Sequence, residues 1–464
     1  MAIQSDRIEH DSLGDREIDN TLYYGVHTTR AVENFPITGI RLNHFPDLVR
    51  ALAMVKLAAA RSNRELGILN EERTNSIAVA CERIIAGEHH DQFVVDMIQG
   101  GAGTSSNMNA NEVIANMALE SLGRQKGDYD HVHPNDHVNL SQSTNDVYPT
   151  SIRLAVIFIS RTLIEQQRKL SEAFRIKSAE FSGIAKVGRT QLQDAVPITL
   201  GSEFASYAST IEEDIVRVTE LSQILKVINL GGTAVGTGIN TPEGYTETVV
   251  RHLSDISGVK LDSAADLVDA SSDMGAFVSF SGLLRRVAVK ISKICNDLRL
   301  LSSGPRAGFG EIVLPPVQAG SSIMPGKINP VIPEVVNQVA YQVVGNDVTI
   351  TMAAENGQLQ LNAMEPVIAF NLLESIRIMA NAMRVLRERC VIGIAADKER
   401  CQLLLHNRLV LATALVPKLG YEKAAEVAKA AQNSRRSVSE VIFESNLMTP
   451  EEYKAATDLN VLLG

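Results

Sequence analysis

The chain has 464 residues, of which 45% are hydrophobic and 21% charged, and these fractions are ordinary for a globular protein in water. Because a single hydrophobic core stops growing well below this length, the sequence predicts two or three domains. The net charge of -10 argues against a nucleic-acid-binding protein, which needs a basic surface.

No apolar run reaches the roughly 18 to 20 residues of a membrane span. The segment from Met1 to Asp15 is polar and mixed in charge, unlike a signal peptide. The four cysteines are scattered, which favours reduced thiols over a disulfide framework or a metal site: Cys81, Cys295, Cys390 and Cys401. Together these features predict a cytoplasmic protein whose partners include neither a membrane nor a nucleic acid.

The first domain, residues 1–140, is predicted to be mainly helical after an irregular start. Glycine and proline interrupt any period in residues 1–45. Helical patterns of apolar residues follow at 46–67 and 77–85, then a glycine-rich stretch, then a helical pattern at 112–122.

The second domain, residues 141–395, is predicted to be a bundle of long helices. Three stretches space their apolar residues in steps of three and four, which is a heptad rhythm: 152–174, 204–228 and 277–298. Two further helices are expected at 332–354, with Pro333 in the first turn, and at 367–390. Helices of about 25 to 30 residues, each roughly 40 Å long, predict an all-α fold.

Long helices leave apolar stripes that one chain does not easily cover, so the pattern favours a homo-oligomer. Beyond Gly393 the patterns shorten, and residues 396–464 are expected to form a small C-terminal helical domain. Its last helix should begin after Thr449, an N-cap residue that Pro450 follows in the first turn.

The stretch that carries most chemistry is 320–330, GSSIMPGKINP. Its glycines and prolines exclude a strand or a helix interior, so it is a loop. Ile323 and Met324 are expected to pack this loop against a core. A fixed loop that presents serine, lysine and asparagine suits the binding of a carboxylate.

Three other segments have more hydroxyl and amide side chains than a helix bundle needs: 100–112, 139–146 and 188–197. Glycines in the first of them allow close approach of backbone amides to a ligand. Each segment alone is also compatible with a turn, a helix cap or a charged loop. Because all four segments lie at predicted helix ends, we expect the long helices to bring them together.

The motifs GGAGTSSNMNANEV, SQSTND, GRTQLQDAVP and GSSIMPGKINP resemble the aspartase/fumarase superfamily in order and spacing along nearly the whole chain. Three details resemble the aspartase branch. Gln191 stands where fumarases typically carry histidine, and residues 293–308 and 358–368 resemble the aspartase versions.

This resemblance implies a three-domain homotetramer in which the long helices of four chains pack together and each active site uses loops from three subunits. It implies reversible deamination of L-aspartate to fumarate and ammonia through an enediolate. No organic cofactor and no metal site are implied, while activation by a divalent cation is left open.

The resemblance also implies a role for each site residue. Ser321 removes the C3 proton, and Lys327 is the cation beside it. Hydrogen bonds to the β-carboxylate, as it becomes the enediolate, come from Thr104, Ser143, Thr144 and Ser322. The α-carboxylate is held by Thr190, Lys327 and Asn329, and the ammonium is oriented by Asn145 with Gln191.

Class II fumarase is the alternative within the same fold. Where fumarases pair a histidine with a glutamate, Gln191 would face Glu334. Because glutamine cannot deliver a proton, elimination of water would lack its usual acid, and Glu334 is expected to be a structural partner. A non-enzymatic helical scaffold is the alternative from another class, and it predicts that the Ser321 hydroxyl is dispensable.

Two further patterns are weaker. His131, His133 and His137 have a spacing that permits metal ligation, but Pro134 argues against a helix there and no fourth ligand is near. The glycine-rich run 231–238 lacks the GxGxxG spacing of a dinucleotide site and follows a helix instead of a strand.

Overall fold

The computed structural model describes residues 6–406, 410–434 and 436–458. Parts of the predicted C-terminal domain therefore lie outside the described residues. The described chain consists mainly of helices with four small two-stranded sheets, which confirms the predicted all-α class. It forms two compact units, one made of residues 1–164, 216–288 and 341–380 and the other of residues 165–215, 289–340 and 381–464. The division at residues 140 and 395 stays a prediction.

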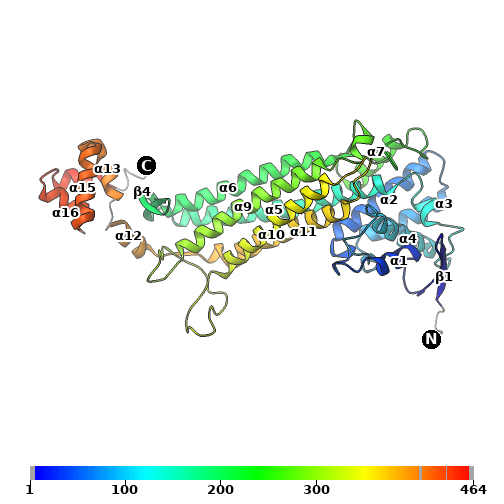
Figure 1. Ribbon diagram of the computed structural model, residues 1–464, viewed down its shortest axis with the longest axis horizontal. Coiled ribbons are helices and arrows are strands. Elements are labelled where there is room, and N and C mark those ends of the chain that lie inside the picture. The colour runs from blue at the N-terminus through cyan, green and yellow to red at the C-terminus, as the bar shows by residue number, and fades with distance from the viewer. Residues whose placement is uncertain (1–5, 407–409, 435, 459–464) are drawn as a thin grey trace. The chain divides into compact units, whose positions relative to one another are not determined.

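Five long helices dominate the chain (Figure 1): α5 (Thr144–Glu180), α6 (Leu200–Leu221), α9 (Gly275–Leu301), α10 (Val331–Glu355) and α11 (Glu365–Arg389). Each of them contributes one stretch to each unit. Among the described residues, only α5 is long and apolar enough to cross a membrane, and 72% of its apolar window is buried inside the protein, as in a core helix.

The helix predicted to continue to residue 228 ends earlier. After α6, Ser222–Lys226 form a 3-10 helix, and Val227–Ile228 form strand β5, which pairs with β6 (Asp262–Ser263) in parallel. The apolar pattern continues past the end of the helix because Leu225 and Ile228 are buried as well. A pattern of buried residues alone therefore does not show where α6 ends and where the 3-10 helix and the strand begin.

In the first unit, neighbouring long helices are joined by buried polar contacts. Asp347 of α10 accepts a hydrogen bond from Ser281 Oγ of α9 at 2.8 Å and pairs with Arg285 at 2.7 Å. Asn346 of α10 donates to Ser375 Oγ of α11 at 2.9 Å. Such pairs fix the register of one helix against the next, which apolar stripes alone leave loosely defined.

In the second unit, an aromatic cluster joins α5 to α6. Phe174 packs against Phe204 and Tyr207, with ring centroids 5.9 and 5.6 Å apart. The Tyr207 hydroxyl donates to Asp297 of α9 at 3.2 Å. The heptad residues predicted from the sequence thus form the contacts between helices.

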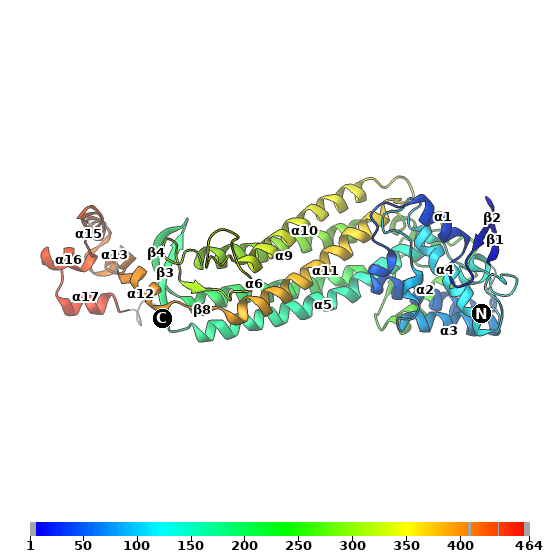
Figure 2. The same cartoon turned by 90° about the horizontal axis from the view of Figure 1, so that it is seen from below.

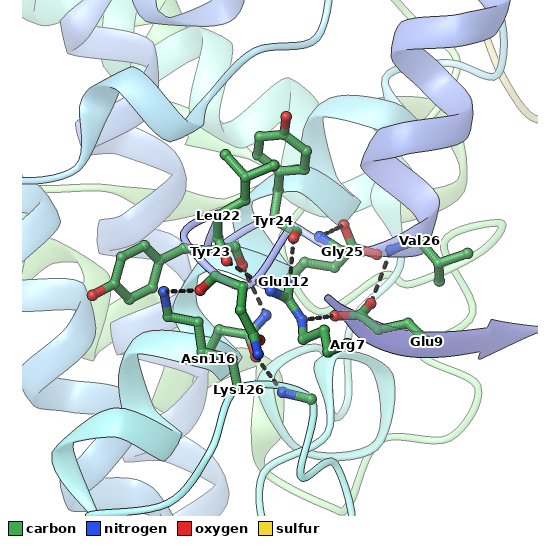
Figure 3. A network of polar contacts seen from close by, with 12 residues as sticks. Arg7, Glu9, Leu22, Tyr23, Tyr24, Gly25, Val26, Glu112, Asn116 and Lys126 are labelled. Carbon is green, nitrogen blue, oxygen red and sulfur yellow. Dashed lines mark hydrogen bonds and ion pairs between the residues drawn. The ribbon is translucent and has the colours of Figure 1, made fainter. Parts of the chain in front are cut away.

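The prediction that residues 1–45 are irregular is wrong for residues 6–45, the described part of this segment. This part contains an antiparallel hairpin, β1 (Arg7–Asp11) with β2 (Gly14–Ile18), and then helix α1 (Val26–Asn34). Figure 3 shows the buried network that holds them. Arg7 pairs with Glu9 at 2.7 Å, Val26 N donates to Glu9 at 2.9 Å, and Gly25 N donates to Glu112 at 2.8 Å. The strands RIEHD and GDREI are mostly polar, and Glu112, which holds the start of α1, is far along the chain, so the apolar pattern of this segment did not reveal its structure.

Helices α2 (Pro46–Glu65), α3 (Glu71–Ile85), α4 (Thr104–Ser121) and α7 (Tyr245–Ser257) complete the first unit, with α8 (Leu267–Ala270), a π-helical turn at Pro134–Val138, and 3-10 turns at Leu42–His44 and His90–Gln92. Helix α4 begins eight residues before the predicted start at 112. Its first turns are rich in asparagine, and these side chains bond to other segments inside the protein. Asn109, for example, accepts from Val94 N and donates to Gln92 O.

The second unit also holds the hairpin of β3 (Ala185–Thr190) and β4 (Gln193–Thr199), the β7 (Ile312–Val313) and β8 (Ala395–Ala396) pair, and a 3-10 turn at Val391–Gly393. The predicted C-terminal helices follow (Figure 2): α12 (Lys398–His406), α13 (Val410–Ala414), α14 (Val416–Leu419), α15 (Tyr421–Ser434), α16 (Val438–Glu444) and α17 (Pro450–Ala456). Thr449 caps α17 as predicted, in a capping box with Glu452.

Candidate functional site

The loop that carries Ser321 closes on itself. Gly320 N donates to Lys327 O at 2.9 Å, and the Asn329 side chain donates to Gly320 O at 2.6 Å. A Cβ on residue 320 would lie 2.3 Å from Lys327 O, so only glycine fits at this point. The closed backbone brings Ser321, Ser322, Lys327 and Asn329 into one loop.

Inside this loop the Ser321 hydroxyl oxygen accepts two backbone hydrogen bonds, from Met324 N at 2.9 Å and from Ile323 N at 3.3 Å. Both donors would stabilise negative charge on Ser321 Oγ. Ser322 and Lys327 are exposed, which leaves their polar groups available to a ligand.

The expectation that Ile323 and Met324 pack against a core is wrong for the described chain. Their exposed fractions are 84% and 47%. The physical reason is that backbone hydrogen bonds close the loop without help from its apolar middle, so these side chains point outward.

A cavity of about 1020 Å³ lies beside the stem of this loop. Lys327 and Asn329 line it, together with Arg299 from the last turn of α9 and Asp397 from the segment before α12. The cavity places two of the predicted carboxylate-binding residues on one surface. Glu334 lies in the first turn of α10, four residues beyond Pro330, and its backbone N–H donates to the Pro330 carbonyl.

Thr190 and Gln191 lie at the tip of the β3–β4 hairpin. Gln191 and Leu192 form the two-residue turn, and both have left-handed backbones, with φ values of 54° and 61°. A type I′ hairpin turn needs this conformation, which glycine and asparagine usually supply. Thr190 and Gln191 are both exposed at this turn.

In the first unit, Thr104 is the first residue of α4, and its hydroxyl donates to Gly101 O at 2.7 Å. The preceding Gly103 has φ +90°, and a Cβ there would lie 2.3 Å from the Tyr148 ring of α5. Glycine at this point lets the beginning of α4 approach the beginning of α5 closely.

The first turn of α5 carries the remaining predicted residues. Asn107 Nδ2 of α4 donates to Thr144 Oγ1 at 3.0 Å. Ser143 Oγ accepts from Asn145 N at 3.3 Å, and Asn145 Nδ2 donates to Ala234 O at 2.7 Å. With that nitrogen engaged, the Asn145 side chain has its oxygen left to accept a hydrogen bond from a ligand.

Two charged residues beneath this turn were missed by the sequence reasoning. Asp146 accepts hydrogen bonds from the backbone nitrogens of Ser143, Gly231 and Thr233, and burial raises its pKa to about 6. Lys56 of α2 donates to Asn139 at 2.8 Å and to Gln142 at 2.9 Å, and burial lowers its pKa to about 7. The sequence does contain a signal for Lys56, because it is the single lysine within the apolar run ALAMVKLAAA.

The structure therefore gathers the predicted residues into two groups. Thr104, Ser143, Thr144 and Asn145 belong to the first unit, at the adjoining ends of α4 and α5. The second unit holds a loop with Ser321, Ser322, Lys327 and Asn329, a hairpin turn with Thr190 and Gln191, and Glu334.

The three histidines have other partners. His133 Nδ1 accepts from Asn135 N and Asp136 N, His137 Nδ1 accepts from His133 N, and His131 contacts Asp128. The prediction that Pro134 excludes a helix is wrong, because Pro134–Val138 form a π-helical turn that begins with this proline. Among the described residues no group of three or more His, Cys, Asp or Glu side chains is arranged to hold a metal ion.

The glycine-rich run 231–238 packs on the first turn of α5, through the Asp146 and Asn145 hydrogen bonds given above. It lies between the two-residue strand β5 and α7, so the prediction that it follows a helix is wrong, but its spacing is not the GxGxxG of a dinucleotide site. Its glycines allow close packing against later segments, since a Cβ would lie 2.5 Å from Thr246 Oγ1 at Gly231 and 2.4 Å from Leu267 O at Gly236.

The chain is similar to known lyases over most of its length. A family model described as Lyase matches residues 14–345, and one described as Fumarase C C-terminus matches residues 411–464. The chain is 57% identical over 447 residues to the aspartate ammonia-lyase of Pseudomonas aeruginosa, which covers 96% of this chain and 94% of the relative.

Two solved structures are similar over almost their full length. The fumarate lyase:delta crystallin from Brucella melitensis bound to cobalt is 56% identical, with a TM-score of 0.96 and coverage of 99% of this chain and 100% of that chain. The class II fumarase from Schistosoma mansoni is 33% identical, with a TM-score of 0.93 and coverage of 97% and 98%.

Proposed function

The chain belongs to the aspartase/fumarase superfamily of lyases, and from this premise we propose that it is an aspartate ammonia-lyase, which converts L-aspartate reversibly to fumarate and ammonia. The names of the relatives at 50% identity and above support this activity over that of the fumarase, which is 33% identical.

The observation that carries the proposed mechanism is the environment of Ser321. Removal of a proton from C3 of aspartate requires a strong base, and a serine alkoxide is strong enough. The two backbone N–H groups that donate to Ser321 Oγ would stabilise the alkoxide, and Lys327 in the same loop supplies a cation. Ser321 is therefore the proposed general base.

Loss of the C3 proton leaves a doubly charged enediolate, and its extra charge needs hydrogen-bond donors that are already in position. We assign Thr104, Ser143, Thr144 and Ser322 to the β-carboxylate. Thr190, Lys327 and Asn329 are assigned to the α-carboxylate. Asn329 uses one amide hydrogen within its own loop, so its second hydrogen is the one proposed to bind substrate.

The leaving group distinguishes an ammonia-lyase from a fumarase. An ammonium group only donates hydrogen bonds. The amide nitrogen of Asn145 donates to Ala234 O, and its amide oxygen is the proposed acceptor for the ammonium group. Gln191 is proposed to assist. Ammonia leaves with its proton already in place, so a glutamine at this position is compatible with the reaction, and Glu334 is proposed as a structural partner.

The assembly follows from the same proposal. We propose a cytoplasmic homotetramer in which each active site combines residues of both groups from three subunits, with no organic cofactor and no resident metal. The exposed apolar side chains Ile323 and Met324 are then surfaces for neighbouring subunits or for bound substrate.

The test follows fumarate by its ultraviolet absorbance, with L-aspartate or L-malate as substrate, for the wild type and for Ser321→Ala. We expect fumarate from aspartate, with a loss of roughly a thousandfold or more in the variant, as when a central catalytic group is removed. The matched control is Ser206→Ala on α6, whose hydroxyl only bonds back to its own helix.

Fumarate formed from malate instead of aspartate would assign the chain to the fumarases. Full activity of Ser321→Ala would reject Ser321 as the base. Absence of both activities in the wild type would favour the scaffold.

A further inference from the structure

A buried ionic cluster lies at the base of the β3–β4 hairpin, outside the residues assigned to substrate. Its centre is Glu311, the residue before β7, which is fully buried. Arg189 approaches Glu311 with both terminal nitrogens, Nη2 lying 2.9 Å from Oε1 and Nη1 donating to Oε2 at 3.1 Å. Lys186 lies 3.1 Å from Glu311 and 2.8 Å from Glu203 of α6.

The backbone around Glu311 is held as firmly as its side chain. Its N–H donates to Leu301 O at 2.9 Å, and its carbonyl accepts from Asp397 N at 3.0 Å. Phe309 lies against the Arg189 guanidinium at 4.2 Å, while Arg400 of α12 donates to Phe309 O at 2.8 Å. The carboxylate of Glu311 is thus a fixed point against which Arg189 is oriented.

Such a cluster is poorly explained by stability alone. Two carboxylates and two cations leave water when the protein folds, and their mutual attraction roughly offsets that cost, so apolar residues of similar size would often serve stability as well. An arginine that contacts both oxygens of a carboxylate and stacks on an aromatic ring is, however, held in a defined orientation. In β3, the residue that follows Arg189 is Thr190.

The cluster also connects two segments that carry residues of the second group. Glu311 immediately precedes β7, which pairs with β8 and leads into the segment that carries Ser321. One ion pair therefore joins the strand ending in Thr190 to the strand leading to the Ser321 loop. Both structures belong to the same unit of the chain.

We propose that Arg189 and Glu311 are positioning residues, whose ion pair sets the hairpin tip with Thr190 and Gln191 relative to the Ser321 loop so that both bind one substrate molecule. This inference rests on the proposed function, since it takes Thr190 to bind the α-carboxylate.

The test compares the wild type with Arg189→Lys and Glu311→Gln, using steady-state kinetics on aspartate and on malate. Lysine keeps the charge but can reach only one oxygen and loses the stacking on Phe309. Because Thr190 is proposed to hold the α-carboxylate in the bound substrate as well as in the transition state, its displacement should weaken binding, and we expect KM to rise about tenfold or more in Arg189→Lys. We expect kcat to change less, and Glu311→Gln to raise KM at least as much.

A readout independent of catalysis accompanies the kinetics. Amide hydrogen exchange over residues 188–196 is expected to accelerate in both variants, because the hairpin tip loses its anchor. The matched control is Arg285→Lys, at the ion pair with Asp347 that joins α9 to α10. This control should leave KM and the exchange of the hairpin unchanged.

Two results would overturn the inference. One is an unchanged KM in both variants, with kcat falling in step with thermal stability, which is the behaviour of a merely structural ion pair. The other is exchange of the hairpin at the wild-type rate. If the wild type converts neither aspartate nor malate, the proposed function fails, and the exchange measurement still decides whether Arg189 and Glu311 hold the hairpin.

Discussion

Lys56 lies in an unusual environment for a lysine. Its side chain is fully buried on α2, and its ammonium group donates to the side-chain oxygens of Asn139 and Gln142. Burial disfavours the charged form and lowers its pKa from 10.5 to about 7, while the nearby Asp146 opposes the shift. Lys56 thus holds the segment before α5 through these two hydrogen bonds. Because of its low pKa, it loses its proton more readily than an exposed lysine does.

This pKa predicts how stability depends on pH. Between pH 7 and 10.5 the unfolded chain binds a proton at Lys56 that the folded protein does not, so the contribution of Lys56 to stability rises with pH in this window. We expect the Tm of the wild type minus the Tm of Lys56→Met to be higher at pH 9 than at pH 7. Thermal unfolding of both proteins at the two pH values measures this signed difference, and a decrease from pH 7 to pH 9 would contradict the prediction.

Gly103 is a second single residue on which the site depends. Replacement by alanine would place a Cβ 2.3 Å from Cδ1 of Tyr148 in a backbone with φ +90°. The left-handed backbone costs about 1–2 kcal/mol, and the overpacking costs about 1–3 kcal/mol more. Gly123→Ala, at φ +71° with open space around it, is the matched control for the backbone term. Urea unfolding should show the larger loss for Gly103→Ala, and equal losses would mean that the Tyr148 contact is unimportant.

At the scale of elements, helix caps define the C-terminal helices. Thr449 accepts from Glu452 N at 3.2 Å, and the Glu452 side chain accepts from Thr449 N at 2.9 Å. Loss of the threonine hydroxyl should destabilise α17 by about 1 kcal/mol. We expect faster hydrogen exchange over residues 450–456 in Thr449→Ala, and no such change in Ser434→Ala, whose hydroxyl only bonds back to its own helix. Unchanged exchange in Thr449→Ala would show that tertiary packing holds α17.

The elements that the sequence predicted well are those with a local cause. Heptad spacing identified α5, α6 and α9, two further helices were expected where α10 and α11 lie, and Thr449 with Pro450 identified the start of α17. The hairpin of β1 and β2 was missed because its strands are mostly polar, and the start of α1 was missed because its partner Glu112 lies far along the chain. The early start of α4 was missed for a related reason, since the partners of Asn107 and Asn109 lie in other segments.

The same limit applies to the site. The hydroxyl and amide residues were recognisable from the motifs, but their orientation was not. Asn145 donates to Ala234 O, which lies in a distant segment. The buried charged groups of Asp146, Lys56 and Glu311 are likewise held by segments far apart in the sequence. A sequence pattern indicates which groups could bind a substrate, and the fold determines which of their atoms remain available.

At the scale of the whole molecule, α10 carries an apolar stripe that the described chain leaves uncovered. Tyr341, Val348 and Met352 are 62%, 54% and 65% exposed. Their spacing, with Gly345 between them, repeats in steps of four, three and four, which places them on one face of the helix. A long apolar face of this kind is typical of a helix that packs against copies of itself, as the proposed tetramer requires.

A charge on this stripe should therefore break the assembly. In Val348→Glu, tetramer formation would bury carboxylates without partners, at a cost of several kcal/mol. We expect light scattering after size-exclusion chromatography to show species smaller than a tetramer. Activity on aspartate should fall at least about tenfold, because each proposed site needs residues from more than one subunit.

Leu13→Glu, on the 77% exposed Leu13 of the β1–β2 turn, is the control and should remain tetrameric and active. A fully active tetramer of Val348→Glu would place the subunit interface on another face, whereas an inactive tetramer would show that α10 affects the site without holding the subunits together.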